Sequence, residues 1–388
     1  MGSLQRSIIT AAALTLSATP ALAGVHTASG TSGDLAWKAQ SKIVGVTSTA
    51  TIAGGGDPLY LAQGPQYSGV VGLVMEYADG SAFVCSGSLL GDRRSVLTAG
   101  HCVSDGFGTA GPEKVTAFFY DGNPADPQYY AQYLFGTPAP GVTQVDTTSI
   151  FVNPGYTGEV IDQNDIAVVR LAQAAPTFAT SYDLFTEGDL TGSIYNIAGY
   201  GARSDGGGYV GDDLAPGRRR QGYNMYDFRL GDDAFDNGFS FLSENGAQIN
   251  YSFLSDFDNG LLRNDTACLT TAFGLGTLSP EFCDTGLGAF EVSSAGGDSG
   301  GPQFIDGKIA SVTSYGLSFG AFYGDVDDDL NSTFGEFNGF VPTYIHTAFI
   351  RGAMVPEPAT WAMMIGGIGL AGGALRRRRQ QTARVNFA

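Results

Sequence analysis

Short apolar segments separated by turn residues run through most of this 388-residue chain and constrain its fold more than any other feature. They include Val70–Tyr77, Ala82–Leu90, Ser95–Ala99, Val115–Tyr120, Thr147–Val152, Ile166–Leu171 and Tyr195–Ala198. Turn sequences such as Ala78-Asp79-Gly80 lie between them. The chain has 57 glycines and shows no long amphipathic helical pattern, so this spacing predicts an all-β fold, a sandwich or a barrel.

The N-terminal end has the pattern of a secretory signal peptide over residues 1–23. Arg6 provides the positive start, Ile8–Leu16 the apolar stretch and Ala21-Leu22-Ala23 the small-residue cleavage site. A buried first strand is the alternative, but it leaves this order of charge, apolar run and small residues unexplained. Residues 24–67 are rich in Gly, Ala, Ser and Thr and are predicted to be a pro-segment or a flexible arm.

The main domain is expected over residues 68–352. A Gly-, Asp- and Asn-rich stretch at about 203–265 is interpreted as an insertion between strands. At the end of the domain, Thr343–Arg351 has apolar residues on one face and predicts a short C-terminal helix.

The C-terminal end combines Val355-Pro356-Glu357-Pro358, the apolar run Ala359–Leu375 and the basic cluster Arg376–Arg379. The apolar run is at the short limit for a transmembrane segment, with the arginines on the cytoplasmic side. Together, residues 355–379 resemble the PEP-CTERM sorting signal of Gram-negative bacteria. That resemblance implies processing by an exosortase after inner-membrane anchoring, and release to the cell surface or the medium. A permanent membrane anchor is the alternative.

The formal net charge of −18 argues against a nucleic-acid-binding protein, which needs a basic face. So acidic a surface favours cations, and a structural Ca²⁺ is one candidate. The clusters Asp256-Phe257-Asp258 and Asp325–Asp329 could bind it, but neither has the EF-hand pattern. Solvated acidic loops are therefore the preferred interpretation.

The four cysteines permit disulfides in an exported protein. Cys85 lies close to Cys102 in the sequence, and Cys268 lies close to Cys283, so local pairing would close short loops. No Cys-x-x-Cys spacing occurs, so no metal site is expected at these cysteines.

The chain has only three histidines, which limits the choice of a proton-shuttling base near neutral pH. His26 lies beside the signal cleavage site and His346 lies in the predicted terminal helix. His101, in the segment Leu97–Cys102, is therefore the candidate base. A satisfied structural histidine is the alternative for any lone His.

Ser299 lies among glycines in Gly297-Asp298-Ser299-Gly300-Gly301-Pro302. Glycines allow a strained turn and leave backbone N–H groups uncovered, as an acyl-transfer site requires. The N–H groups of Gly297 and Ser299 are the expected oxyanion hole. A plain turn is the alternative in a chain so rich in glycine.

Two segments, Thr98–Cys102 and Gly297–Pro302, resemble in this order the signatures of the chymotrypsin/trypsin family of serine proteases. Further resemblances lie in Cys85–Leu90, Asn164–Leu171, Ala198–Gly201 and Ser314–Gly316. The resemblance covers about residues 70–351 and implies two antiparallel six-stranded β-barrels. It also implies an acyl-enzyme on Ser299, with Asp165 as the acid that orients His101. A simple turn residue is the alternative for Asp165.

The same resemblance implies the substrate-binding residues. Ser314, Tyr315 and Gly316 would hold the substrate backbone, while Ser293 would form the base of the P1 pocket and Gly339 a wall. Because Ser293 is not an acid, apolar or aromatic P1 residues are expected rather than Arg or Lys.

Two other positions depart from or extend the family pattern. Ala295 replaces the cysteine that usually closes a pocket disulfide, whereas Cys268–Cys283 resembles a common family bridge. Asp298 in the family receives a new N-terminal ammonium created by zymogen cleavage, and Lys42-Ile43-Val44-Gly45-Val46 resembles such an activation site. A partner for Asp298 within the protein is the alternative.

The expected function is that of a secreted serine endopeptidase acting on proteins or peptides without a cofactor. A catalytically silent surface or matrix-binding protein on the same fold is the alternative. A serine esterase of α/β-hydrolase type is disfavoured, because that class places Ser before Asp and His in the chain.

Overall fold

The computed structural model describes residues 26–33, 35–40, 43–106, 111–121, 140–275 and 277–354, with 368, 370, 371, 375 and 376 of the C-terminal tail. The predicted signal peptide lies outside these residues, as does most of the predicted membrane segment at 359–375. Within the described part of the chain, no helix is both long and apolar enough to cross a membrane.

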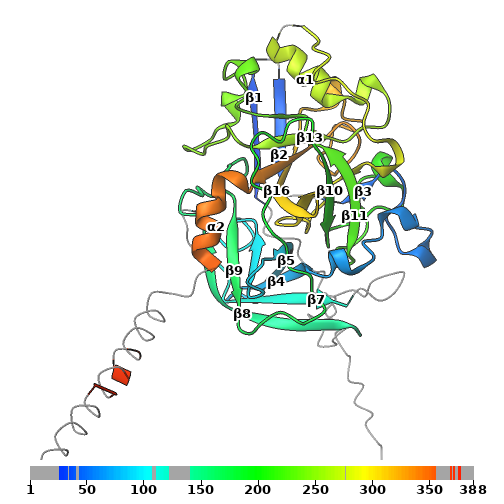
Figure 1. Ribbon diagram of the computed structural model, residues 1–388. Helices are drawn as coiled ribbons and strands as arrows, with labels where there is room; N and C mark the ends of the chain where they lie inside the picture. Colours follow the sequence, from blue (N-terminus) through cyan, green and yellow to red (C-terminus); the bar gives the residue numbers. More distant parts are fainter. Residues whose placement is uncertain are drawn as a thin grey trace, which may run out of the picture.

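The first half of the domain is a closed antiparallel barrel of six strands, at the lower side of Figure 1. The strands pair in the order β4-β5-β6-β9-β8-β7. Their bounds are β4 Val70–Glu76, β5 Ala82–Leu89, β6 Ser95–Thr98, β7 Lys114–Tyr120, β8 Val142–Val152 and β9 Ala167–Leu171. Closure pairs the edges of all six strands, and alternate residues such as Leu73, Val96 and Val169 fill the interior.

The second half is built on a nine-stranded sheet, in the upper part of Figure 1. Its main path runs β11-β10-β15-β16-β17-β13-β12, and β2 joins β16 while pairing with β1. The bounds are β1 Thr27–Ser32, β2 Leu35–Gln40, β10 Ile194–Gly199, β11 Arg220–Met225, β12 Phe228–Arg229, β13 Phe253–Asp256, β15 Pro302–Ile305, β16 Lys308–Ser318 and β17 Phe337–Pro342. A separate pair joins β3 (Val44–Gly45) to β14 (Val292–Ser293).

The all-β prediction is therefore confirmed, with one difference in detail. The pairing of the described strands closes the first barrel with six strands but leaves the second sheet open. Three strands of that sheet, β11, β12 and β13, come from the stretch interpreted as an insertion at 203–265. These three strands lie on the main path of the sheet, and β1 and β2 add to that path at β16.

Within the described residues 26–354, two short α-helices accompany the sheets. The predicted C-terminal helix is α2 (Thr347–Met354), which buries Ile350 and Ala353 and lies beside β9 in Figure 1. α1 (Thr266–Leu275) was not predicted and lies at the far end of the second half. Single 3-10 turns occur at Ile52–Gly54, Pro58–Tyr60, Pro65–Tyr67, Gly207–Tyr209, Asp233–Phe235, Ser240–Leu242, Leu262–Asn264, Gly288–Phe290, Ala321–Tyr323 and Tyr344–His346.

The strands β1 and β2 form a hairpin on the second sheet. β1 and β2 pair with each other, and β2 pairs with β16. Leu35, Trp37 and Ala39 are buried, whereas the alternate residues Ala36 and Lys38 are exposed. The hairpin therefore packs with one apolar face inward, as a period of two residues requires.

Residues 49–67 are held against the second sheet by two buried arginines. The Arg219 guanidinium donates to the carbonyl oxygens of Ala62 and Tyr67 at 2.7–3.1 Å. The Arg220 guanidinium donates to the carbonyl oxygens of Thr49 and Ala50, both at 2.8 Å. These bonds satisfy the buried charges and bind this segment to the domain.

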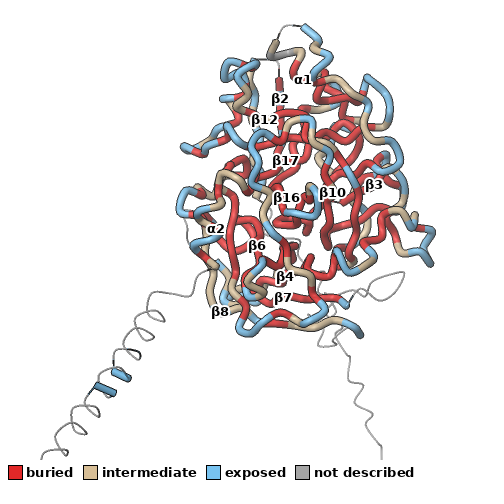
Figure 2. Tube along the Cα trace, viewed as in Figure 1, coloured by how far each residue is buried: buried red, intermediate tan, exposed pale blue. Residues whose placement is uncertain are grey.

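Buried residues run continuously through both halves, and exposed residues are concentrated in the peripheral loops (Figure 2). One acidic segment departs from this distribution. Asp256 and Asp258, expected in a solvated loop, are only 3% and 2% exposed. Asp256 ends β13, an interior strand between β12 and β17, and pairs there with Phe337 of β17, while Asp258 follows two residues later.

Candidate active site

His101 follows β6 and is held at two points by Asp165. Its ring Nδ1 lies 2.7 Å from Asp165 Oδ2, and its backbone N–H donates to Oδ1 at 2.7 Å. Asp165, just before β9, is 1% exposed. Gly100 allows this close approach, since a Cβ there would lie 3.0 Å from Asp165 Oδ1. The carboxylate therefore fixes both the backbone and the ring orientation of His101, which leaves Nε2 for other contacts.

Ser314 on β16 also binds Asp165. Its hydroxyl donates to Asp165 Oδ2 at 2.5 Å. The register of β16 against β17 shifts between Thr313 and Tyr315, and such bulges redirect side chains. Burial alone would raise the pKa of Asp165, but the attraction of His101 and hydrogen bonds from His101 and Ser314 outweigh burial and lower it. Asp165 is therefore ionised at neutral pH. The sequence placed Ser314 near substrate but did not indicate this contact.

Ser299 lies in the turn between β14 and β15, pressed against the first barrel. Its carbonyl accepts from the Ser86 N–H at 2.8 Å. Gly300 has a φ of +76° and donates to the Thr313 carbonyl at 2.8 Å. A Cβ at Gly300 would lie 2.1 Å from Thr98 Oγ1. Glycine is thus required here both by the backbone angle and by the close contact.

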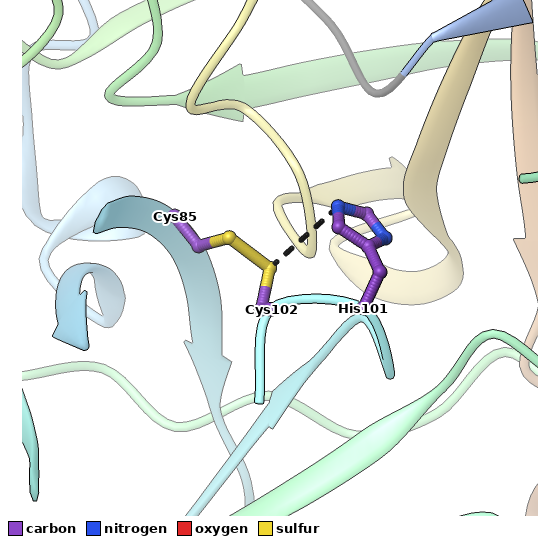
Figure 3. A group of neighbouring side chains, drawn as sticks. All are labelled: Cys85, His101 and Cys102. Carbon is purple, nitrogen blue, oxygen red and sulfur yellow. Dashed lines mark hydrogen bonds between the residues drawn. A yellow bond between two sulfur atoms is a disulfide. The ribbon is translucent and has the colours of Figure 1, made fainter. Parts of the chain in front are cut away.

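The Cys85–Cys102 disulfide lies between His101 and Ser299 and contacts both residues. Cys102 Sγ lies 3.9 Å from His101 Nε2 (Figure 3) and 3.6 Å from the carbonyl oxygen of Ser299. Ser299 Oγ has no hydrogen-bond partner among the described residues, so it is not bonded to His101 here. Catalytic hydrogen bonds are often long without substrate and tighten when it binds. Because both sulfurs are in the disulfide, Cys85, His101 and Cys102 are not a thiolate metal site.

Two backbone N–H groups in the Ser299 turn are free to act as donors. The N–H groups of Gly297 and Ser299 make no hydrogen bond to any residue that the structure describes. Gly297 has a φ of +102°, which glycine adopts without strain. The predicted oxyanion-hole residues therefore present donors beside the Ser299 side chain.

Asp298, between them, points into the protein. Its carboxylate accepts from the N–H groups of Gly201 at 2.8 Å, Ala295 at 3.0 Å, and Ile43. A Cβ at Gly199 or Gly201 would lie 2.1 or 2.4 Å from the carboxylate, which explains the glycines of this segment. Burial raises the pKa of Asp298 to about 7, against the opposing effect of these hydrogen bonds. The contact with Ile43 joins the predicted activation segment to the Ser299 turn.

The predicted P1 pocket has a polar base, and one of its expected residues changes. Ser293 Oγ donates to Asn338 Oδ1 at 2.9 Å, and Asn338 lies opposite Gly316 in the pairing of β16 with β17. Gly339 is opposite Tyr315 instead, and a Cβ there would meet the Tyr315 ring at 2.2 Å. Asn338, and not Gly339, therefore lies next to Ser293, because alternate residues of a strand face opposite sides.

Tyr315 itself does not present its ring to the cleft. The ring is fully buried and its hydroxyl lies 2.7 Å from Ser252 Oγ. Only the backbone of Ser314–Gly316 is left to contact an extended chain at this edge.

In the structure, that edge is already paired. Gln40 of β2 lies opposite Gly316, and Lys38 lies opposite Ser318. At the same open end of the hairpin, where Thr27 pairs with Gln40, the ring centroid of His26 is 6.5 Å from that of His101. Burial, followed by repulsion from His101, lowers the pKa of His26. His101 and Ser299 are consequently 6% and 0% exposed. The hairpin covers the predicted substrate cleft, which the sequence did not indicate.

The second disulfide, Cys268–Cys283, lies in the second half and ties α1 to the loop that follows it. Both local pairings allowed by the sequence are therefore formed, and the described residues include no free cysteine.

A buried carboxylate–imidazole pair, a serine in a glycine turn and free backbone donors define the class of serine hydrolases. Residues 62–214 match the family model Trypsin, and residues 355–379 match the PEP-CTERM protein-sorting motif. These matches support a trypsin-family protease with a C-terminal PEP-CTERM sorting signal. The trypsin match includes His101 and Asp165 but ends before Ser299. No curated protein matches the chain.

Proposed function

We propose that this protein is an exported serine endopeptidase in which Ser299 is the nucleophile, His101 the base and Asp165 the orienting acid. The observation that carries the proposal is the 2.7 Å contact between Asp165 and His101, beside a glycine turn that holds Ser299 next to the Cys102 sulfur. A protein that only binds would not need this arrangement.

Each step of the reaction has a residue in the site. His101 Nε2 takes the Ser299 hydroxyl proton as Ser299 Oγ attacks the peptide carbonyl carbon, and ionised Asp165 stabilises the imidazolium. The N–H groups of Gly297 and Ser299 stabilise the oxyanion of the tetrahedral intermediate. His101 then gives the proton to the leaving amine, and water hydrolyses the acyl-enzyme by the same steps. This chemistry needs no cofactor.

The substrate is an extended protein or peptide chain that adds to the edge of β16. The backbone of Ser314–Gly316 would pair with it as that of Gln40 does now. The uncharged base at Ser293 disfavours Arg and Lys at P1 and favours apolar residues, including aromatic ones. The Asn338 side chain, bonded across the base to Ser293, limits how long that P1 side chain can be.

Residues 24–42 form the inhibitory part of a zymogen in this proposal. Cleavage between Lys42 and Ile43 would release the hairpin from β16 and from His101. The new Ile43 ammonium would then pair with Asp298, which already accepts the Ile43 N–H. Because the P1 pocket does not fit Lys42, cleavage requires a second protease with basic specificity. The mature domain accordingly begins at Ile43, and residues 43–67 remain bound through Arg219 and Arg220.

The PEP-CTERM motif at 355–379 implies sorting through the cell envelope. We propose transient anchoring in the inner membrane by residues 359–375, cleavage by an exosortase and a final location at the cell surface or outside the cell. The exosortase would be the processing partner, and protein substrates the others.

The proposal is tested by digesting a proteome-derived peptide library with the protein cleaved after Lys42, next to its Ser299→Ala variant. We expect cuts at internal peptide bonds, after uncharged residues, that are absent with the variant. Intact peptides with both proteins would contradict the endopeptidase and favour a silent binding protein.

A further inference from the structure

Three buried aspartates meet in the second half of the domain, away from the proposed active site. Asp256 ends β13, Asp258 follows two residues later, and Asp265 immediately precedes α1. One carboxylate oxygen from each lies within 4.8 Å of the others. Their exposed fractions are 3%, 2% and 1%, respectively. The chain thus gathers three acids at one point out of contact with water.

Three carboxylate oxygens of this cluster have no hydrogen-bond partner in the part of the chain that the structure describes. Both carboxylate oxygens of Asp258, and Oδ2 of Asp265, are buried without a hydrogen bond to the described residues. None of the three acids forms an ion pair with a Lys, Arg or His in the described ranges. A buried carboxylate without a partner is costly, so native proteins pair such groups or bind a metal through them.

The surroundings add negative charge rather than remove it. Glu291 Oε1 accepts from the Asp258 N–H at 2.5 Å, and Asp227 Oδ2 accepts from the Asp256 N–H at 2.7 Å. Both of these acids are buried as well. A cation at this point would relieve both the burial cost and the repulsion.

A second acidic cluster, formed by Asp325, Asp327 and Glu336, provides a comparison because its carboxylates do have hydrogen-bond donors or water around them. Asp325 Oδ2 accepts from Ser318 Oγ, and Glu336 accepts from the N–H groups of Asn331 and Thr333. Asp327 is exposed to water. Its acids are satisfied by neighbouring donors or by solvent, and this cluster needs no ion.

We propose that Asp256, Asp258 and Asp265 bind a calcium ion. Carboxylate oxygens are the ligands that this hard cation prefers, and its flexible coordination tolerates ligands from a strand end, a loop and a helix start. The Cys268–Cys283 disulfide holds the start of α1, and with it Asp265, in place.

The position gives the ion a structural effect on the proposed pocket. Glu291, which holds the Asp258 backbone, is followed directly by β14 and therefore by Ser293. β14 in turn pairs with β3 of the proposed activation segment. Calcium would therefore link β13, α1 and the strand that carries the pocket base.

The test uses the exported chain with Ser299→Ala, so that self-digestion does not interfere. Calcium binding is measured by calorimetry after treatment with EDTA, and Tm is measured with and without Ca²⁺. We expect one ion per chain and a rise in Tm of roughly 5–10 °C when calcium exceeds its Kd about a hundredfold. This readout is independent of proteolysis, so its failure leaves the proposed function untouched.

Two added substitutions make the assignment specific. Asp258→Asn should abolish the calcium-dependent rise in Tm, yet in EDTA it should be as stable as the parent or more so, because it replaces a buried acid that has no hydrogen bond to the described residues. The matched variant Asp327→Asn, in the other acidic cluster, should keep the full calcium response. No calcium binding by the parent, an undiminished response in Asp258→Asn, or a loss of the response in Asp327→Asn would each overturn the proposal.

Discussion

The two halves of the domain divide the proposed active site between a regular barrel and an elaborated sheet. The first half is closed by six strands, lies wholly within the trypsin-family match and supplies His101 and Asp165. The second half supplies Ser299 and the pocket, but it adds strands, a hairpin at the cleft and a buried acidic cluster. In this account the first half provides the proposed base and its orienting acid, whereas the proposed control of access, specificity and ion binding lies in the second half.

The largest expected effect comes from the residues that join the two halves. Ser299→Ala and His101→Ala should each lower kcat by about 10⁶-fold, because the two act as one unit. Asp165→Asn should lower it by about 10⁴-fold, since the His101 ring would lose its orientation. Peptide hydrolysis by the cleaved protein measures this. Ser88→Ala is the control and should be fully active, because its buried hydroxyl on β5 makes no hydrogen bond to the residues that the structure describes. If the Asp165 variant is as active as the control, Asp165 does not orient His101 as proposed.

The hairpin is tested by weakening its packing in protein that cannot be cleaved because it carries Lys42→Ala. Trp37 is 3% exposed, so Trp37→Ala should cost about 3–5 kcal/mol of the packing that holds β2 on β16. We expect the uncleaved protein to gain peptidase activity. Phe119→Ala, in the core of the first barrel, should lower Tm without activating the protein. A Trp37 variant that is destabilised but still inactive would refute the inhibitory role.

Removing each disulfide in turn allows the two halves to be compared directly, because the two disulfides close loops of similar length. Cys85 and Cys102 are 17 residues apart, and Cys268 and Cys283 are 15 apart. Replacing either pair with alanines should lower the free energy of unfolding by about 3 kcal/mol in the chain-entropy model. Only loss of Cys85–Cys102, whose sulfur contacts His101 and Ser299, should also lower kcat at a temperature where both variants are folded. Denaturant unfolding gives the free energy of unfolding, and peptide hydrolysis gives kcat. Equal kcat values for the two variants would show that the contact of the Cys102 sulfur with His101 and Ser299 does not matter for activity.

Specificity should depend on Asn338 in the second half. Asn338→Gly should open the pocket base and raise kcat/KM for an aromatic P1 residue relative to alanine by roughly 10-fold or more. Matched peptides that differ only at P1 measure the ratio. Ser293→Ala, which leaves the Asn338 side chain in place, should change the ratio much less. If Asn338→Gly leaves this ratio unchanged, Asn338 does not limit the P1 side chain and another residue forms that wall of the pocket.

The smallest expected effect is a pH dependence at Asp298. Burial raises its pKa to about 7 in the uncleaved chain, above the unfolded value of about 3.9. The stability that the protonated group contributes is therefore complete below about pH 4 and is lost as pH rises to about 7. In the cleaved protein, the Ile43 ammonium should keep Asp298 ionised and remove this loss. Tm profiles from pH 4 to 8 of the uncleaved and cleaved forms should diverge, and parallel profiles would contradict the ion pair.

Local sequence patterns were enough to predict much of the fold and of the proposed site. The strands of the first barrel follow apolar runs, and the motifs around His101 and Ser299 are each contiguous in the sequence. What the sequence did not reveal depends on contacts between distant segments. The register shift at Ser314 decides that Asn338, not Gly339, faces Ser293. The burial of Asp258 depends on how β13 and α1 fold together, although its charge alone resembles that of a solvated loop.

The hairpin was also not predicted from the sequence, although its second strand does have a recognisable strand pattern. Its composition is that of a flexible arm, and that composition governed the prediction. The alternation of Leu35, Trp37 and Ala39 with small or charged residues was nevertheless a strand pattern.

The most direct test of the proposed enzyme is fluorophosphonate labelling of the protein before and after cleavage at Lys42–Ile43. Ser299 should be labelled rapidly in the cleaved form and slowly or not at all in the uncleaved form, and the label should disappear in Ser299→Ala. Absence of any Ser299-dependent label in the cleaved, folded protein would contradict the assignment of Ser299, His101 and Asp165 as a working catalytic site.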